Sequence, residues 1–261
     1  MKTFRFFKII GILGILGLFC FSSASAAERG PKSNTRSYPI NGLYHKLVVG
    51  SGFDITLSDT AKSAMVTVPA EAHKHVVVEL SNGTLRIALR DKIKLKKRPT
   101  LVLPRNDQLT NIELTDGATL SVGSITGETI DIFLNDGASF RGDITAKQVN
   151  IEQAGGTDYR GKIFVDNVSL NLRGASTIEL RGRCLVKMDL KMREASNLDA
   201  EKLEVRRIEG SLGDASNAVV WCTERLQVPV NDASHLIYIG RPRLVNCPTG
   251  AMSSVVAKQN R

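Results

Sequence analysis

The sequence predicts an all-β protein built as a parallel β-helix, or solenoid, of about seven short coils with a β-rich cap at its N-terminal end. Three observations support this prediction: a short phrase that recurs seven times, alternating apolar and polar residues between its copies, and the lack of helical periodicity there. A regular period sustained over such a length is typical of a solenoid, whose repeats bury their apolar faces against neighbouring repeats.

The repeated phrase consists of two polar or small residues, then Ala or Gly, then Ser or Thr. Its third residues recur at intervals of 18 to 20 positions. The seven copies are Asp116–Thr119, Asp136–Ser139, Ala154–Thr157, Arg173–Ser176, Arg193–Ser196, Gly213–Ser216 and Asn231–Ser234. Between copies, segments such as Met188–Met192 alternate apolar and polar residues, which favours short strands.

Equivalent residues of successive coils lie one above another in such a stack. We therefore expect the small third residue of the phrase to fill a crowded corner, and the hydroxyl residue after it to form a column. A hydroxyl group both donates and accepts, so the column can bond along the stack or to turn backbone. The predicted column is Thr119, Ser139, Thr157, Ser176, Ser196, Ser216 and Ser234.

Composition divides the chain after its leader into three parts. Residues 39–110 form the predicted β-rich cap, residues 111–247 the solenoid repeats and residues 248–261 a polar tail. Within the cap, Asn82-Gly83 is typical of a tight hairpin turn between two strands. Proline residues end the repeat pattern near the C-terminus, because proline cannot continue a β-ladder.

Residues 1–26 have the pattern of a secretory signal peptide, with basic residues, an apolar run and a small-residue cleavage site. The apolar run, Ile9–Phe21, has 13 residues, and a bilayer span needs roughly 20. An uncleaved anchor is the alternative, and the bulky Phe19 disfavours lipidation of Cys20. Residues 27–38 are polar and predict a flexible leader. We therefore expect an exported protein, in the periplasm, on the outer-membrane surface or secreted.

The formal charge of +9 is unevenly distributed: residues 39–110 carry a net +5 and residues 111–247 a net −3. The sharpest basic feature is the segment 90–98, in which every second residue is basic. In a strand, alternate residues share one face. The candidate residues for binding an anionic surface are Arg90, Lys92, Lys94, Lys96 and Arg98.

An acidic polysaccharide, another cell-surface component or a membrane surface would fit such a basic face. The alternative is a solvated edge strand, whose lysines discourage pairing with another strand. Nucleic acid is a poor candidate, because aromatic residues make up only 5% of the chain and offer no evident stacking platform.

Three cysteines follow the predicted signal peptide, and an exported chain can form one disulfide from them. Cys184 and Cys222 lie two coils apart, roughly 10 Å at about 4.8 Å per coil, which is too far for a bond. Cys222 with Cys247 is the more plausible pair. The alternative is that all three cysteines are small buried apolar residues.

The sequence indicates no catalytic, cofactor-binding or metal-binding set. The histidines at 45, 73, 75 and 235 lack the spacing of metal ligands. Carboxylates are numerous along the repeats, but no spacing singles out a group in mutual reach. We therefore expect no cofactor, no metal and no catalytic residue.

The β-rich segment Leu47–Ile55, the hairpin at Asn82–Leu85 and the recurrent phrases resemble the putative auto-transporter adhesin, head GIN domain family (DUF2807). The resemblance covers about residues 40–240 and departs from the pattern at Gly155–Thr157. It implies an exported bacterial β-solenoid, of a kind common in Bacteroidetes, with no demonstrated reaction.

The expected function is therefore non-catalytic, in cell-surface or glycan interaction of an adhesin-like kind. Two alternatives remain: a polysaccharide-degrading β-helix enzyme and a structural protein of the cell envelope. The ligand and the oligomeric state do not follow from the sequence.

Overall fold

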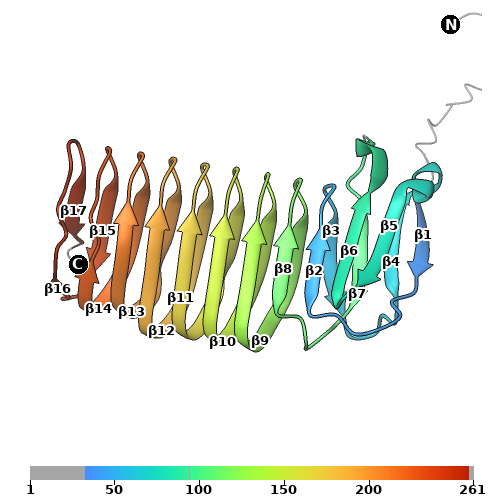
Figure 1. The fold of residues 1–261 in the computed structure, drawn as a ribbon, viewed down its shortest axis with the longest axis horizontal. Coiled ribbons are helices and arrows are strands. Elements are labelled where there is room, and N and C mark those ends of the chain that lie inside the picture. The colour runs from blue at the N-terminus through green and yellow to red at the C-terminus, as the bar shows by residue number, and fades with distance from the viewer. Residues whose placement is uncertain (1–32, 94, 259–261) are drawn as a thin grey trace, which may run out of the picture. The chain divides into compact units, whose positions relative to one another are not determined.

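The structure is a computed structural model that describes residues 33–93 and 95–258. Strands account for 64% of the chain and stack as about eight coils (Figure 1). The predicted β-solenoid is thereby confirmed. The predicted signal peptide and the first part of the predicted leader lie outside the described residues.

The N-terminal part holds eight short strands and two 3-10 helices. They are β1 (Ser33–Tyr38), β2 (Lys46–Val49), β3 (Asp54–Ser58), β4 (Ala64–Pro69), η1 (Ala70–His75), β5 (Val76–Ser81), β6 (Thr84–Leu89), η2 (Arg90–Lys92), β7 (Thr100–Pro104) and β8 (Asn111–Leu114). The long strands that follow are β9 (Thr119–Leu134), β10 (Ser139–Gln153), β11 (Asp158–Leu172), β12 (Thr177–Met192), β13 (Asn197–Leu212) and β14 (Asn217–Gln227). The C-terminal strands are β15 (His235–Ile239), β16 (Arg243–Leu244) and β17 (Ser254–Ala257).

Each of the strands β9 to β13 runs through nearly one whole coil and pairs in parallel with the next. The strand turns over at one edge of the stack, and a tight corner closes the coil at the other edge (Figure 1). A coil therefore contributes to two sheets. We call them the leading sheet, which holds the first part of each long strand, and the trailing sheet, which holds the second part. Their inward side chains form one apolar core between them.

The coils turn at two-residue corners in which both residues have positive φ. The pairs are Ser51–Gly52, Asp116–Gly117, Asp136–Gly137, Gly155–Gly156, Gly174–Ala175, Glu194–Ala195, Asp214–Ala215 and Asp232–Ala233. Two successive positive φ angles are what a tight primed turn requires, and glycine adopts them at the least cost. The recurrent Asp and Gly of the early copies of the phrase, and the Ala of the last four copies, are therefore corner residues.

The register of the strands corrects the predicted hydroxyl column. Ser139 is aligned with Asp158 and not with Thr157. The buried column consists of Ala118, Ala138, Thr157, Ser176, Ser196, Ser216 and Ser234. Thr119 and Ser139 lie one position further along the chain and are only half-buried. Thr119 and Ser139 therefore do not belong to this buried column, in which the hydroxyl residues of the other five copies lie.

The physical reason is a shift of the phrase relative to the corner. In the first two copies the corner pair is Asp–Gly, so Ala118 and Ala138 follow it and are fully buried. In later copies the alanine is itself the second corner residue, as at Ala175 and Ala195, and is exposed. The predicted buried alanine is wrong for these later copies.

The buried hydroxyl groups bond both along the stack and to the turns. The Thr157 hydroxyl donates to Ser176 Oγ at 3.1 Å. The hydroxyls of Ser176 and Ser196 donate to the carbonyls of Arg173 and Arg193 at 2.5 and 2.6 Å. These bonds satisfy carbonyl groups at the corner that no strand partner reaches, so the column stabilises the turns.

The N-terminal part contributes coils of its own. Strand β2 pairs in parallel with both β6 and β8, and β3 pairs with both β7 and β9. The coil of residues 46–58 therefore lies between the coil of residues 84–104 and the first long one. Strand β5 pairs with β6 in an antiparallel hairpin through Asn82 and Gly83, both with positive φ, which confirms the predicted hairpin turn.

The predicted flexible leader is partly ordered. Strand β1 pairs with β4 in antiparallel register from Ser33 to Tyr38. The Tyr38 hydroxyl lies 3.0 Å from His73 Nδ1, and His73 Nε2 lies 2.9 Å from the Asn34 carbonyl. His73 is buried, so this histidine holds the first strand onto the end of the stack.

Candidate functional site

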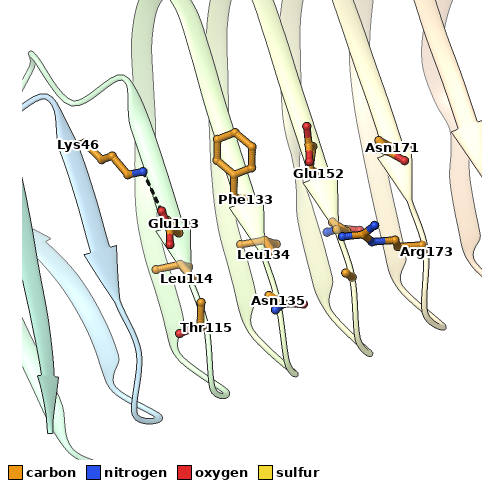
Figure 2. Close-up of a pocket in the computed structure, with 12 residues that line it drawn as sticks. Lys46, Glu113, Leu114, Thr115, Phe133, Leu134, Asn135, Glu152, Asn171 and Arg173 are labelled. Carbon is orange, nitrogen blue, oxygen red and sulfur yellow. Dashed lines mark ion pairs between the residues drawn. The ribbon is translucent and has the colours of Figure 1, made fainter. Parts of the chain in front are cut away.

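A groove of about 310 Å³ lies on the outer face of the trailing sheet, next to the corners (Figure 2). Two rows of side chains border it, and each row takes one residue from each of several successive coils. The row on the sheet is Glu113, Phe133, Glu152 and Asn171, and the row at the corners is Thr115, Asn135, Ala154 and Arg173. Strand alternation turns both rows outward, and the coil register aligns them.

The groove offers one aromatic side chain among polar and charged ones. Phe133 is half-buried in the sheet row, and Glu152 and Arg173 are exposed. Lys46 Nζ and Glu113 Oε2 form an ion pair at 2.8 Å at one end of the groove (Figure 2). Within residues 33–93 and 95–258, neither Glu152 nor Arg173 has an ion-pair partner. Both side chains are therefore available to a ligand.

A second hollow of about 460 Å³ continues the same face toward the C-terminal coils. It shares Asn171 with the first and is bordered by Lys191, Arg193, Ser211 and Asn231. These residues prolong the same two rows, because Asn171, Lys191 and Ser211 are aligned in adjacent strands. Together the two hollows, which we call the trailing-sheet groove, follow the axis of the stack across successive coils.

A ladder of amide and carboxylate groups lies beside the groove and holds this face together. Asn150 Nδ2 donates to Asp131 Oδ1 at 2.7 Å, and Gln148 Nε2 donates to Asn150 Oδ1 at 2.9 Å. Asn111 Nδ2 reaches the other oxygen of Asp131 at 3.5 Å. The bonds from Asn111 and Asn150 to Asp131 connect three successive coils through their side chains.

Sequence reasoning missed the trailing-sheet groove. Its residues stand 19 or 20 positions apart, as do Glu113, Phe133, Glu152 and Asn171, and their types differ from coil to coil. Comparing the repeats for identical residues reveals the corners, because their residues recur. It does not reveal this row, because its residues differ between coils. Aligning the repeats on their positive-φ corners and comparing outward positions would have found it.

The basic segment is not a strand. Arg90–Lys92 forms the short helix η2, with Asp91 at positive φ. Residues 90–99 replace the two-residue corner of their coil, because β6 and β7 stack on β2 and β3, which the Ser51–Gly52 corner joins. Ile93 and Leu95 do pack toward the core. The described residues of the segment therefore do not form the predicted strand, and Lys94 lies outside the described residues.

Arg98 is engaged within the protein. Its guanidinium donates to the carbonyls of Gly52 and Gly117 at 3.3 and 2.5 Å, and it pairs with Asp54 at 3.3 Å. It therefore braces two adjacent corners. Arg90, Lys96 and Lys97 are exposed, and a hollow of about 490 Å³ lies under the segment.

The three cysteines are free thiols, so the expected bond between Cys222 and Cys247 is not formed. Cys184 and Cys222 are buried in one inward row. Burial raises the pKa of each of these two thiols to about 11. The Cys184 and Cys222 thiols donate to backbone carbonyls at 3.1 Å, which suits small buried side chains.

Two kinds of feature are absent from residues 33–93 and 95–258. No group of three or more His, Cys, Asp or Glu in that part of the chain is placed to hold a metal ion. Nor does it contain a helix with the length and apolar character needed to cross a bilayer.

Comparison with known proteins places the fold among solved structures. No protein with a curated description matches the chain. A "putative lipid binding protein" and a "putative adhesin", both from Parabacteroides distasonis, have TM-scores of 0.75 and 0.76 at 19% and 18% identity. A "putative adhesin" from Parabacteroides merdae has a TM-score of 0.75 at 14% identity. Each comparison covers 87% of this chain and 97% of the other.

At such identities these likenesses show a shared fold. The family itself follows from the sequence profile, which matches residues 43–242 and so most of the chain. The chain belongs to the family described as putative auto-transporter adhesin, head GIN domain.

Proposed function

We propose that this chain is an exported, non-catalytic β-solenoid that binds linear glycans at the cell surface through the trailing-sheet groove. The observation that carries the proposal is the groove itself, which follows the stack axis and sets Phe133 among Asn135, Glu152, Asn171 and Arg173. An aromatic ring contacts the apolar face of a sugar, while amide, carboxylate and guanidinium groups bond its hydroxyls. The adhesin description of the family supports a role in surface contact.

The groove suits an extended polymer better than a small molecule. Its residues come from successive coils, so its polar groups recur at roughly 4.8 Å along one line. It is open along its length, whereas small-molecule sites enclose most of their ligand. A chain of sugars can therefore lie along the sheet and contact several coils at once.

The proposal is tested by measuring glycan binding to the chain and to two matched variants. Phe133→Ala should weaken binding about two- to tenfold, because an aromatic contact contributes ~0.5–1.5 kcal/mol. Phe164→Ala is the control, since Phe164 is also an outward aromatic, 55% exposed, but does not line the groove. A screen of neutral and acidic glycans supplies the ligand, and calorimetry gives the affinities. No glycan bound, or equal losses in both variants, would contradict the proposal.

Cleavage of a polysaccharide is the second candidate function, because two carboxylates line the groove. Glu113 and Glu152 are two coils apart, roughly 10 Å between Cα atoms. Inverting glycosidases place their carboxyl groups about 6.5–9.5 Å apart. Mass spectrometry of the bound glycan after long incubation decides between the two functions. Shortened products that disappear in Glu152→Gln would establish an enzyme.

The basic segment of residues 90–98 is a further candidate for contact with anionic surfaces. Arg90, Lys96 and Lys97 are exposed. Arg98 is exposed as well, but it bonds to the carbonyls of Gly52 and Gly117 and pairs with Asp54. Anionic vesicles, compared with neutral ones, are the direct probe of this contact.

A further inference from the structure

Four cations are stacked in consecutive coils on the outer face of the trailing sheet, near the edge opposite the corners that border the groove. They are Lys187, Arg207, Arg225 and Arg243, which the strand registers place directly opposite one another. We call them the basic rail. Lys187 is partly exposed and the three arginines are exposed. The equivalent positions in earlier coils are the neutral Thr129, Gln148 and Asn167.

Most of the rail has no internal counter-charge. Lys187 Nζ lies 3.0 Å from Asp189 and 3.9 Å from Glu209. Among residues 33–93 and 95–258, no carboxylate forms an ion pair with any of the three arginines. Arg225 instead donates to the neutral amide of Gln227. Within the described residues the three stacked guanidinium groups therefore have no carboxylate in ion-pair contact, and Arg207 donates to the Val186 carbonyl at 3.5 Å.

The chain pairs opposite charges across coils at neighbouring positions. Arg206 pairs with Glu224 at 2.5 Å, one residue away from the rail. Lys147 pairs with Glu128 at 2.6 Å in the same row of earlier coils. Like charges directly opposite each other in adjacent strands are destabilising. The run of three arginines without a carboxylate partner is thus a cost to the free chain that a bound anion would remove.

We propose that the basic rail binds a linear acidic polysaccharide laid along the axis of the stack. The rail extends over three coil intervals, roughly 14 Å at about 4.8 Å each. A polymer with several anionic groups can reach all four cations, and a single small anion cannot. Guanidinium groups present paired donors that fit carboxylate and sulfate groups.

The neighbours of the rail favour a polysaccharide over single-stranded nucleic acid. The rows on its two sides present Asp189, Glu209 and Gln227, and Val186, Arg206 and Glu224. None of these side chains is aromatic, and proteins that hold single strands stack the bases on aromatic rings. The site is separate from the trailing-sheet groove and does not depend on the function proposed for that groove.

The probes are an octamer of galacturonic acid, the methyl-esterified octamer, which lacks the charges, the monomer, and an eight-nucleotide oligothymidylate. We expect the chain to bind the acidic octamer with an affinity that falls steeply as salt is raised. The esterified octamer and the monomer should bind at least tenfold more weakly. Equal affinity for the esterified octamer, or tighter binding of the oligothymidylate, would overturn the proposal.

Two double variants with the same change in net charge locate the site. Arg207→Gln with Arg225→Gln should weaken binding of the acidic octamer at least tenfold and leave the thermal unfolding temperature unchanged or higher. Arg141→Gln with Arg160→Gln, on the leading sheet, should keep the affinity within about twofold. Equal losses in both would show attraction to net charge and overturn the rail. Phe133→Ala should leave octamer binding unchanged, which separates this proposal from the groove.

Discussion

Gln153 occupies a position that its neighbours fill with apolar side chains. Its inward row in adjacent coils consists of Leu114, Leu134, Leu172, Met192 and Leu212. Gln153 is 1% exposed, and neither its Oε1 nor its Nε2 has a hydrogen-bond partner within the described residues. A buried amide without partners costs free energy that a leucine of similar length would not.

We therefore expect Gln153→Leu to raise the free energy of unfolding by about 1–2 kcal/mol. The matched control is Leu172→Gln in the next coil, which should lower it by about 1–3 kcal/mol for the same reason. Urea-induced unfolding followed by circular dichroism gives both values. A loss of stability in Gln153→Leu would contradict this account and point to a bound water that satisfies the amide.

At the scale of the element, two glycines of the long strands differ in what surrounds them. A Cβ on Gly210 would lie 1.7 Å from the carbonyl oxygen of Leu190, and its φ is +153°. A Cβ on Gly123 would meet nothing within 4 Å. The backbone of β13 thus approaches β12 closely at a position where only hydrogen fits.

Gly210→Ala should therefore lower the free energy of unfolding by roughly 2–4 kcal/mol, because the coil must shift to make room. Gly123→Ala should change it by no more than about 0.5 kcal/mol. Thermal unfolding of the two variants under the same conditions is the measurement. Equal stabilities would show that β13 adapts at no cost.

The elements show what the sequence could and could not predict. Period and alternation indicated the coils and the hairpin at Asn82, because both depend on local backbone preferences. The alignment of Ser139 with Asp158, instead of Thr157, was not predictable from the repeated phrase. The register of the strands depends on which residues of each corner take positive φ. Arg98 shows the same limit: its partners at Gly52 and Gly117 are distant in sequence and come together only in the stack.

The candidate site was even less accessible to sequence reasoning than the fold. Strand alternation alone indicates that a side chain such as Phe133 or Arg207 faces outward, but its neighbours lie a full coil away. Whether Arg207 meets a cation or a carboxylate depends on a register that bulges change from coil to coil. The sequence therefore predicted a basic site at residues 90–98, where the cations are consecutive. It did not predict the basic rail, whose cations stand a full coil apart.

Across the whole molecule, stability should fall in alkaline solution. Burial raises the pKa of Cys184 and Cys222 from 9.0 to about 11 and that of Tyr44 to about 12, and it also raises the pKa of Tyr159. A raised pKa in the folded state means that the unfolded chain loses its protons first. The contribution of the thiols is complete below about pH 9 and is lost as the pH rises toward 11.

We expect the free energy of unfolding to decline between pH 9 and 11, measured by urea unfolding at each pH. Cys184→Val with Cys222→Val should flatten much of this decline, because the same inward row already holds Val165 and Val205. A variant as sensitive to alkali as the parent chain would assign the effect to the tyrosines.

The insertion of the coil of residues 46–58 between two later coils sets an order of events in folding. Leu47 lies between Leu85 and Ile112, so one side of the first coil has no neighbour until β8 and the start of β9 are present. A chain that emerges from its N-terminus must keep this coil open while the hairpin of β5 and β6 forms. The later coils, each resting on the one before, can then add in sequence. The first coil in the sequence is thus covered on both of its sides by strands that come later in the chain.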